Sequence, residues 1–162
     1  MNPKEDFTKA ILDHQGLLYK ISLLYTDNPQ DREDLYQEIV YQLWKSYDSF
    51  NAFSKLSTWM YRVGLNTAIY QLKKSKRTIA TTAIDPKMYH IAEHSDQADE
   101  ENLKRIYRQI QKLNLLEKGI ILLYLEGKSH EEISEIIGLS KSNVGTRISR
   151  IKEKLKTQLT TN

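Results

Sequence analysis

Apolar residues recur at intervals of three or four positions along most of this 162-residue chain, which is the spacing of an amphipathic helix. Only 6 glycines and 3 prolines interrupt the pattern, fewer than the many turns of a sheet protein require. The pattern therefore predicts an all-α protein. Cysteine is absent, which excludes disulfide frameworks, thiolate zinc sites and cysteine nucleophiles.

Charge is distributed unevenly along the chain. Residues 1–77 hold 11 basic and 9 acidic side chains, residues 78–101 hold 1 and 6, and residues 102–162 hold 12 and 6. The segment 78–95 also lacks a sustained apolar period, which favours a flexible acidic linker. We therefore expect two small helical domains, 1–77 and 96–162, joined by this linker. The basic C-terminal block indicates a polyanionic partner, although an ordinary solvated surface is an alternative.

The first domain shows the period of several helices. One long helix is predicted over residues 6–25, and a turn over 26–31 follows, with Pro29 as a helix stop. Asp31 can cap a second helix, and a third helix covers residues 55–77.

Residues 129–156 predict a helix-turn-helix. Ser129 and Glu132 fit a capping box at the start of a short helix, Gly138 supplies the left-handed position that ends it, and Ser140 can cap the next helix. Opposite an apolar side, that next helix carries Lys141, Ser142, Asn143, Gly145, Thr146, Arg147, Ser149 and Arg150. Small residues among these let the backbone approach base edges, and the arginines can contact guanine or phosphate. A polar, basic second helix is typical of a major-groove reader. A plain helical hairpin with a solvated basic face is the alternative.

The helix predicted over residues 55–77 has two separate lines of side chains when residues are placed about 100° apart. The apolar line, which suits packing on a core, consists of Tyr61, Leu65, Ala68, Ile69 and Leu72. The polar line consists of Trp59, Arg62, Asn66, Tyr70, Lys73 and Arg77. An aromatic ring, an amide and cations in one line suit an unpaired nucleic-acid strand. A membrane-surface helix would need a broad apolar face open to lipid instead. For Trp59 alone, packing against the second helix near Trp44 is the alternative.

A short pattern in the linker resembles a zinc-peptidase motif. His90, Glu93 and His94 have the spacing of two ligands and a base. Such a site needs a third ligand and a rigid scaffold, whereas this segment is the least regular part of the chain. We therefore expect a solvated turn here, with no metal, no cofactor and no catalytic residue.

Three stretches together carry a family resemblance, namely DLYQEIVYQLW at 34–44, YDSF…STWMYRVGLNTA within 47–68, and the helix-turn-helix region 122–155. The chain resembles the extracytoplasmic-function (ECF) group of bacterial sigma factors, which direct RNA polymerase to promoters. The resemblance implies a non-enzymatic, cytoplasmic protein that binds core polymerase and promoter DNA. A stand-alone helix-turn-helix regulator is the alternative function. No apolar stretch approaches the roughly 20 residues that span a bilayer, so no membrane insertion is expected.

The resemblance also implies residue roles. Asp34, Gln37 and Glu38 would bind the clamp helices of the largest polymerase subunit, while the flap of the second largest subunit is a further expected contact. Residues 141–150 would bind the −35 element as duplex. The candidates for melting and holding the −10 element are Asn51, Trp59, Arg62, Asn66, Tyr70, Lys73, Lys74 and Arg77. An anti-sigma factor is expected as a regulatory partner.

Overall fold

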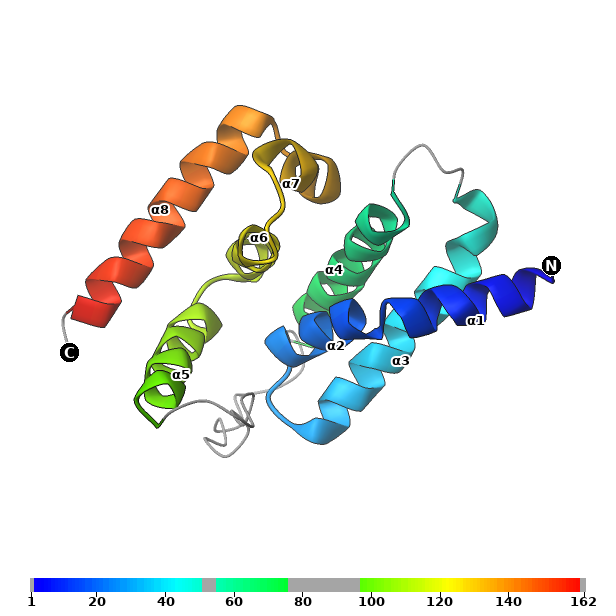
Figure 1. The fold of residues 1–162 in the computed structure, drawn as a ribbon, viewed down its shortest axis with the longest axis horizontal. Helices are drawn as coiled ribbons and strands as arrows, with labels where there is room; N and C mark the ends of the chain where they lie inside the picture. The colour runs from blue at the N-terminus through cyan, green and yellow to red at the C-terminus, as the bar shows by residue number, and fades with distance from the viewer. Residues whose placement is uncertain (1, 51–54, 76–96, 161–162) are drawn as a thin grey trace. The chain divides into compact units, whose positions relative to one another are not determined.

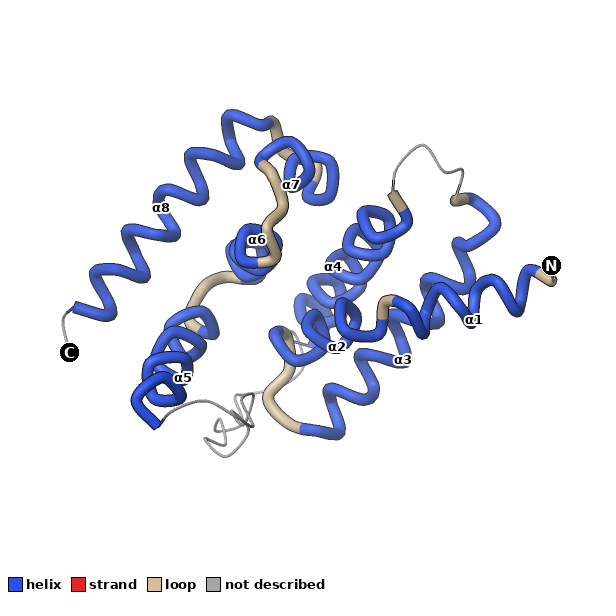
Figure 2. The backbone as a smooth tube through the Cα atoms, viewed as in Figure 1, coloured by secondary structure: helices blue, strands red, loops and turns tan. Residues whose placement is uncertain are grey.

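Helices form every regular element of the described residues in the computed structural model, and these residues are 2–50, 55–75 and 97–160 (Figure 1). Figure 2 shows the helices joined by loops, with no strand drawn in the described part of the chain. The prediction of an all-α protein is therefore confirmed. The chain divides into two compact units, residues 1–85 and 86–162. The predicted linker lies outside the described residues, so its boundaries stay a prediction.

The first unit is built from α1 (Pro3–Asp13), α2 (Gln15–Leu24), α3 (Pro29–Ser46), the short 3₁₀ helix η1 (Tyr47–Ser49) and α4 (Leu56–Ser75). Helices α2, α3 and α4 pack against one another. Their shared core contains the fully buried side chains Leu18, Ile21, Ile39, Leu43, Met60 and Leu65. A side chain at Gly64 would place its Cβ 2.8 Å from the Cδ1 atom of Ile21, so the glycine permits the close approach of α4 to α2.

The prediction of one long helix over residues 6–25 is wrong. The helix breaks at His14, whose imidazole Nδ1 lies 2.9 Å from the carbonyl oxygen of Ala10. Before the break, Phe7 packs with its ring centroid 5.0 Å from that of Trp44 on α3. After the break, α2 joins the core formed with α3 and α4. The apolar period continues through His14, and therefore could not reveal that the two halves pack on different surroundings.

The start of α3 also differs from expectation. Pro29 does not stop a helix but is the first residue of α3, where a missing N–H leaves no intrahelical bond unmade. Asn28, and not Asp31, is the N-cap, because its side-chain oxygen accepts a hydrogen bond from the Asp31 backbone N–H at 2.7 Å.

The second unit is built from α5 (Gln97–Gln111), α6 (Leu115–Leu125), α7 (His130–Ile137) and α8 (Lys141–Thr160). Helices α6, α7 and α8 pack on one another, and α5 packs mainly on α8. The core that they share contains Ile120, Leu123, Ile133, Val144, Ile148 and Ile151. The predicted capping box of Ser129 and Glu132 is present, and Gly138 has a φ of 85° at the end of α7. The turn between α7 and α8 therefore has the predicted local chemistry.

Candidate nucleic-acid interface

The first candidate surface is the outer face of α8. Val144, Ile148 and Ile151 are buried beneath it and fix the rotation of the helix. The exposed residues of the predicted set are Lys141, Ser142, Asn143, Thr146, Ser149 and Arg150. Gly145 and Arg147 are half-buried. The turn at Gly138 and the Ser140 cap therefore present the predicted residues together on one side of one helix.

Two hydrogen bonds fix side chains on this face. Arg147 donates from Nε to Oδ1 of Asn143 at 2.9 Å, and the Thr146 hydroxyl donates to the Ser142 carbonyl oxygen at 3.1 Å. The first bond holds the Arg147 guanidinium against one edge of the exposed face. Such preorganisation reduces the entropy lost when an arginine contacts a base or phosphate.

The second candidate surface is the polar line of α4. Asn66, Tyr70, Lys73 and Lys74 are exposed, with Tyr70 at 64% exposure, and Arg62 is half-buried. Cations and an aromatic ring therefore lie along the solvent side of α4, as the helical spacing predicts. Asn51 and Arg77, which were also predicted for this surface, lie outside the described residues, as do His90, Glu93 and His94.

Trp59 does not belong to this exposed line, and that part of the prediction is wrong. Its side chain is only 8% exposed. The indole lies 5.1 Å from the ring of Phe50 and 6.1 Å from that of Tyr47, measured between centroids. Tyr47 contacts Phe7 in turn, at 5.2 Å. The segment around η1 therefore covers the first turn of α4, and helical spacing alone cannot show such a cover. Trp59 therefore packs in the core, as the alternative interpretation predicts, and its ring contacts are with Tyr47 and Phe50.

The third candidate surface is the exposed side of α3. Asp34 and Gln37 are exposed, and Glu38 is half-buried. The Gln37 amide lies 3.5 Å from a Glu33 carboxylate oxygen, and the Gln42 amide donates to Glu38 at 3.0 Å. All three predicted residues thus lie on one helix, with two of them held by neighbours one turn away.

Two aromatic residues that the sequence did not indicate as part of this surface extend this side of α3. Tyr41 and Trp44 are 52% and 47% exposed. Tyr41 follows Glu38 by three positions, the spacing that keeps residues on one helical face. Their helical spacing from the three polar residues was the signal available in the sequence.

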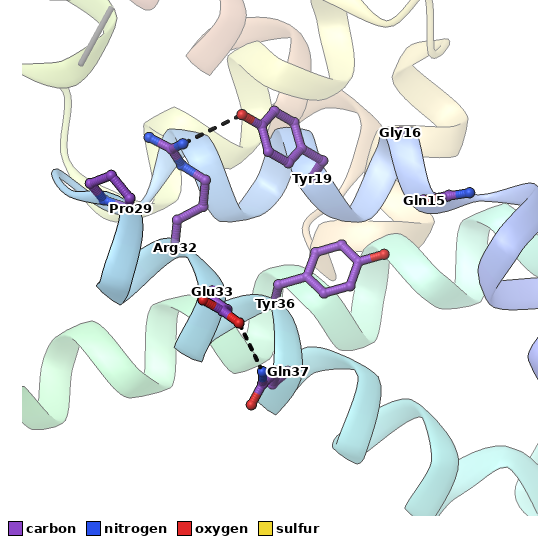
Figure 3. Close-up of a pocket in the computed structure, with 8 residues that line it drawn as sticks. All are labelled: Gln15, Gly16, Tyr19, Pro29, Arg32, Glu33, Tyr36 and Gln37. Atoms are coloured by element: carbon purple, nitrogen blue, oxygen red, sulfur yellow. Dashed lines mark hydrogen bonds between the residues drawn. The ribbon is translucent and has the colours of Figure 1, made fainter. Parts of the chain in front are cut away.

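A pocket of about 760 Å³ borders the same surface between α2 and α3 (Figure 3). Arg32 lies in it with its guanidinium carbon 5.7 Å from the Tyr19 ring centre and Nη1 3.4 Å from the Tyr19 hydroxyl. Burial raises the pKa of the Tyr36 hydroxyl above its ordinary value. Gln37 also lines the pocket. Its residues come from two helices, so no single motif in the sequence could indicate it.

Two further searches of the described residues bear on function. No helix in the described ranges is long and apolar enough to cross a membrane. Within the same ranges, no group of three or more histidine, aspartate or glutamate side chains is placed to hold a metal ion.

The fold and these polar helical faces define a two-domain protein of the sigma-70 class. Residues 10–78 match the family model for Sigma-70 region 2, and residues 103–155 match the model for Sigma-70 region 4. The chain belongs to the ECF family of RNA polymerase sigma factors. Members of this family are transcription initiation factors that act with RNA polymerase.

Individual relatives agree with this assignment. The chain is 28% identical to RNA polymerase sigma factor SigV of Bacillus subtilis, over 97% of this chain and 96% of that protein. It is 30% identical to the ECF RNA polymerase sigma-E factor of Escherichia coli K12, over 76% of this chain and 71% of that protein. Its fold matches the sigma factor RpoE solved with the anti-sigma factor NepR from Bartonella quintana, with a TM-score of 0.77, 23% identity and coverage of 96% and 98%.

Proposed function

We propose that this chain binds core RNA polymerase through the exposed side of α3 and directs it to promoters through α4 and α8. On this proposal α8 binds the −35 element as duplex, and the polar line of α4 holds the melted −10 strand. The main support is that α8 presents six exposed members of the predicted set on a helix whose rotation is fixed by buried residues. Because both proposed partners, RNA polymerase and promoter DNA, are in the bacterial cytoplasm, the chain would act there.

The division between α3 and α8 gives the proposal its physical basis. Carboxylates and an amide on α3 suit a protein partner, and the carboxylates would repel phosphate. The cations and hydroxyls of α8 suit the edges and phosphates of a major groove. The two surfaces thus differ in chemistry in the way that their proposed partners, a protein and duplex DNA, differ.

Transcription from a promoter library tests the proposal. The purified chain is combined with bacterial core polymerase, and transcripts that depend on the chain are sequenced. Asp34→Ala should reduce co-precipitation of polymerase, whereas Arg147→Ala should leave it intact and reduce transcription. Asp13→Ala, which removes an exposed carboxylate from α1, is the matched control and should change neither result.

A stand-alone regulator would give a different result. Its affinity for duplex DNA would not rise when core polymerase is added, and Asp34→Ala would change the result of neither assay. If no library promoter yields a transcript that depends on the chain, the sigma-factor proposal fails.

We also propose that an anti-sigma factor regulates this chain by covering these surfaces. The support is that a protein with the same fold, the sigma factor RpoE, was solved in complex with the anti-sigma factor NepR. Affinity purification of the full chain from its own cells, under uninduced conditions, should recover one such protein in place of polymerase.

A further inference from the structure

His130 lies beside the candidate DNA-binding helix without belonging to it. It is the first residue of α7, directly after the Ser129 cap, and its side chain is exposed. A Cβ atom built on Gly145 of α8 would lie 3.4 Å from Nδ1 and 3.6 Å from Cε1 of its imidazole. The His130 ring therefore packs against α8 at Gly145, where a Cβ atom would be in ordinary van der Waals contact with it. The sequence pattern alone predicts a different role for Gly145, which is close approach of the backbone to bases.

The position of Gly145 on α8 shows which edge the imidazole occupies. With about 100° per residue, the centre of the exposed face falls near Thr146. Gly145 lies at one edge of that face and Arg147 at the opposite edge. Arg147 is held there by Asn143. The exposed face is thus bordered by a guanidinium on one side and by the His130 imidazole on the other.

A helix in the major groove has a phosphate backbone on each side of it, because the groove is only about 12 Å wide. We propose that His130, when protonated, contacts a backbone phosphate on the Gly145 side of α8. It would thereby make duplex binding stronger as the pH falls from about 8 to about 6, the interval in which histidine ordinarily changes its charge. This inference rests on the proposed binding of duplex DNA by α8.

The surrounding charges favour this dependence on His130. On α7, Glu132 is engaged by the capping box and lies 4.0 Å from Lys128, and Glu131 is exposed. On the same edge of α8, Lys141 precedes Gly145 by one turn. Lys152 follows by two turns, with its ammonium 4.3 Å from the centre of the Tyr124 ring. Lysine and glutamate do not ordinarily change charge in this interval, so histidine protonation supplies the change.

The test measures duplex affinity of the full chain by fluorescence anisotropy at about pH 6 and about pH 8, the two sides of the histidine transition. The probe is a duplex that the wild-type chain itself selects from a randomised pool. Wild type should bind about two- to fivefold tighter at the lower pH, as expected for one exposed ion pair. The slope of log affinity against log salt should also steepen by about 0.9 at the lower pH, corresponding to one added phosphate contact.

Three variants separate this role from a structural one. His130→Gln should show neither the pH effect nor the change in salt slope, and its circular dichroism should match that of wild type. His130→Lys should bind at the higher pH as wild type binds at the lower. A His14→Gln, His90→Gln, His94→Gln triple variant removes the remaining histidines of the chain and should keep the full pH effect.

The inference is overturned if His130→Gln keeps the pH dependence and the change in slope. Failure of the underlying function gives another pattern, because Arg147→Ala would then also leave duplex affinity unchanged. If Arg147→Ala weakens binding while His130→Gln matches wild type at both pH values, α8 binds duplex and only the inference about His130 fails.

Discussion

Replacing Trp59 by alanine should unfold the first unit more easily, because Trp59 is part of its packing. The indole is 8% exposed and contacts the rings of Tyr47 and Phe50. Through Tyr47 and Phe7, the same cluster reaches Trp44 on α3. The cluster as a whole thus connects the start of α4 to α1 and to the end of α3.

The expected loss is about 3–5 kcal/mol in the free energy of unfolding, the usual cost of a buried aromatic-to-alanine change. Within that sum, each aromatic contact accounts for about 0.5–1.5 kcal/mol beyond the buried area. A domain of this kind is stable by only about 5–15 kcal/mol, so the loss is a large share of the total.

Hydrogen exchange followed by mass spectrometry can measure this loss in the intact chain. Core amides of α4 should exchange about 10² to 4 × 10³ times faster in Trp59→Ala, because each 1.4 kcal/mol is about a factor of ten. Amides of α8 belong to the other compact unit and serve as an internal reference. Tyr70→Ala, at a 64% exposed position of the same helix, is the matched control and should leave α4 protected.

A direct DNA role for Trp59 predicts the opposite pair of results. In that case Trp59→Ala would lose less than about 1 kcal/mol of stability, within the range of surface substitutions or slightly above it. The variant would nevertheless lose binding to an unpaired strand. Such an outcome would refute the packing role assigned here to Trp59.

Three further substitutions test other parts of the structure. Gly64→Ala should destabilise the first unit by about 1–3 kcal/mol, as measured by thermal unfolding, because the added Cβ would lie 2.8 Å from Cδ1 of Ile21. Unchanged stability would contradict the close packing of α2 and α4. Gly138→Ala should cost the second unit about 1–2 kcal/mol because its φ is 85°, as measured by urea denaturation, and a neutral result would argue against this turn. Arg147→Ala should cost about 1–3 kcal/mol on preferred duplexes if it contacts a base edge, whereas an equal loss on all sequences in a binding selection would indicate phosphate contact alone.

The helix-turn-helix could be predicted from sequence because its signals are local. A capping box, a left-handed glycine and a second cap all lie within 129–140, and each acts on backbone groups a few positions away. The apolar spacing of α8 then determines which side is buried. These caps and the apolar spacing of α8 are together sufficient to predict which way the DNA-binding residues face.

The start of α3 was a local error, since Asn28 and not Asp31 is its N-cap, but two other errors occurred where distant segments decide the outcome. His14 interrupts an apolar period that looks continuous, since Phe7 on one side of it packs on Trp44 and Leu18 on the other side joins a different part of the core. Trp59 was assigned to the solvent side by spacing alone, and Phe50 covers it from outside the helix. The helical period gives the direction of a side chain around the helix axis, but it does not show which other segment covers that side chain.

Removing Trp59 from the exposed line changes which residue can stack on a base there. Among the described members of that line, Tyr70 is the remaining aromatic residue, and it is 64% exposed. Asn66 precedes it by one turn and Lys73 follows by nearly one, both exposed. A ring between an amide and a cation retains the stacking surface, the polar group and the charge that suit an unpaired strand. The aromatic residue of the proposed −10 surface is therefore Tyr70, which lies about three turns nearer the C-terminus of α4 than Trp59.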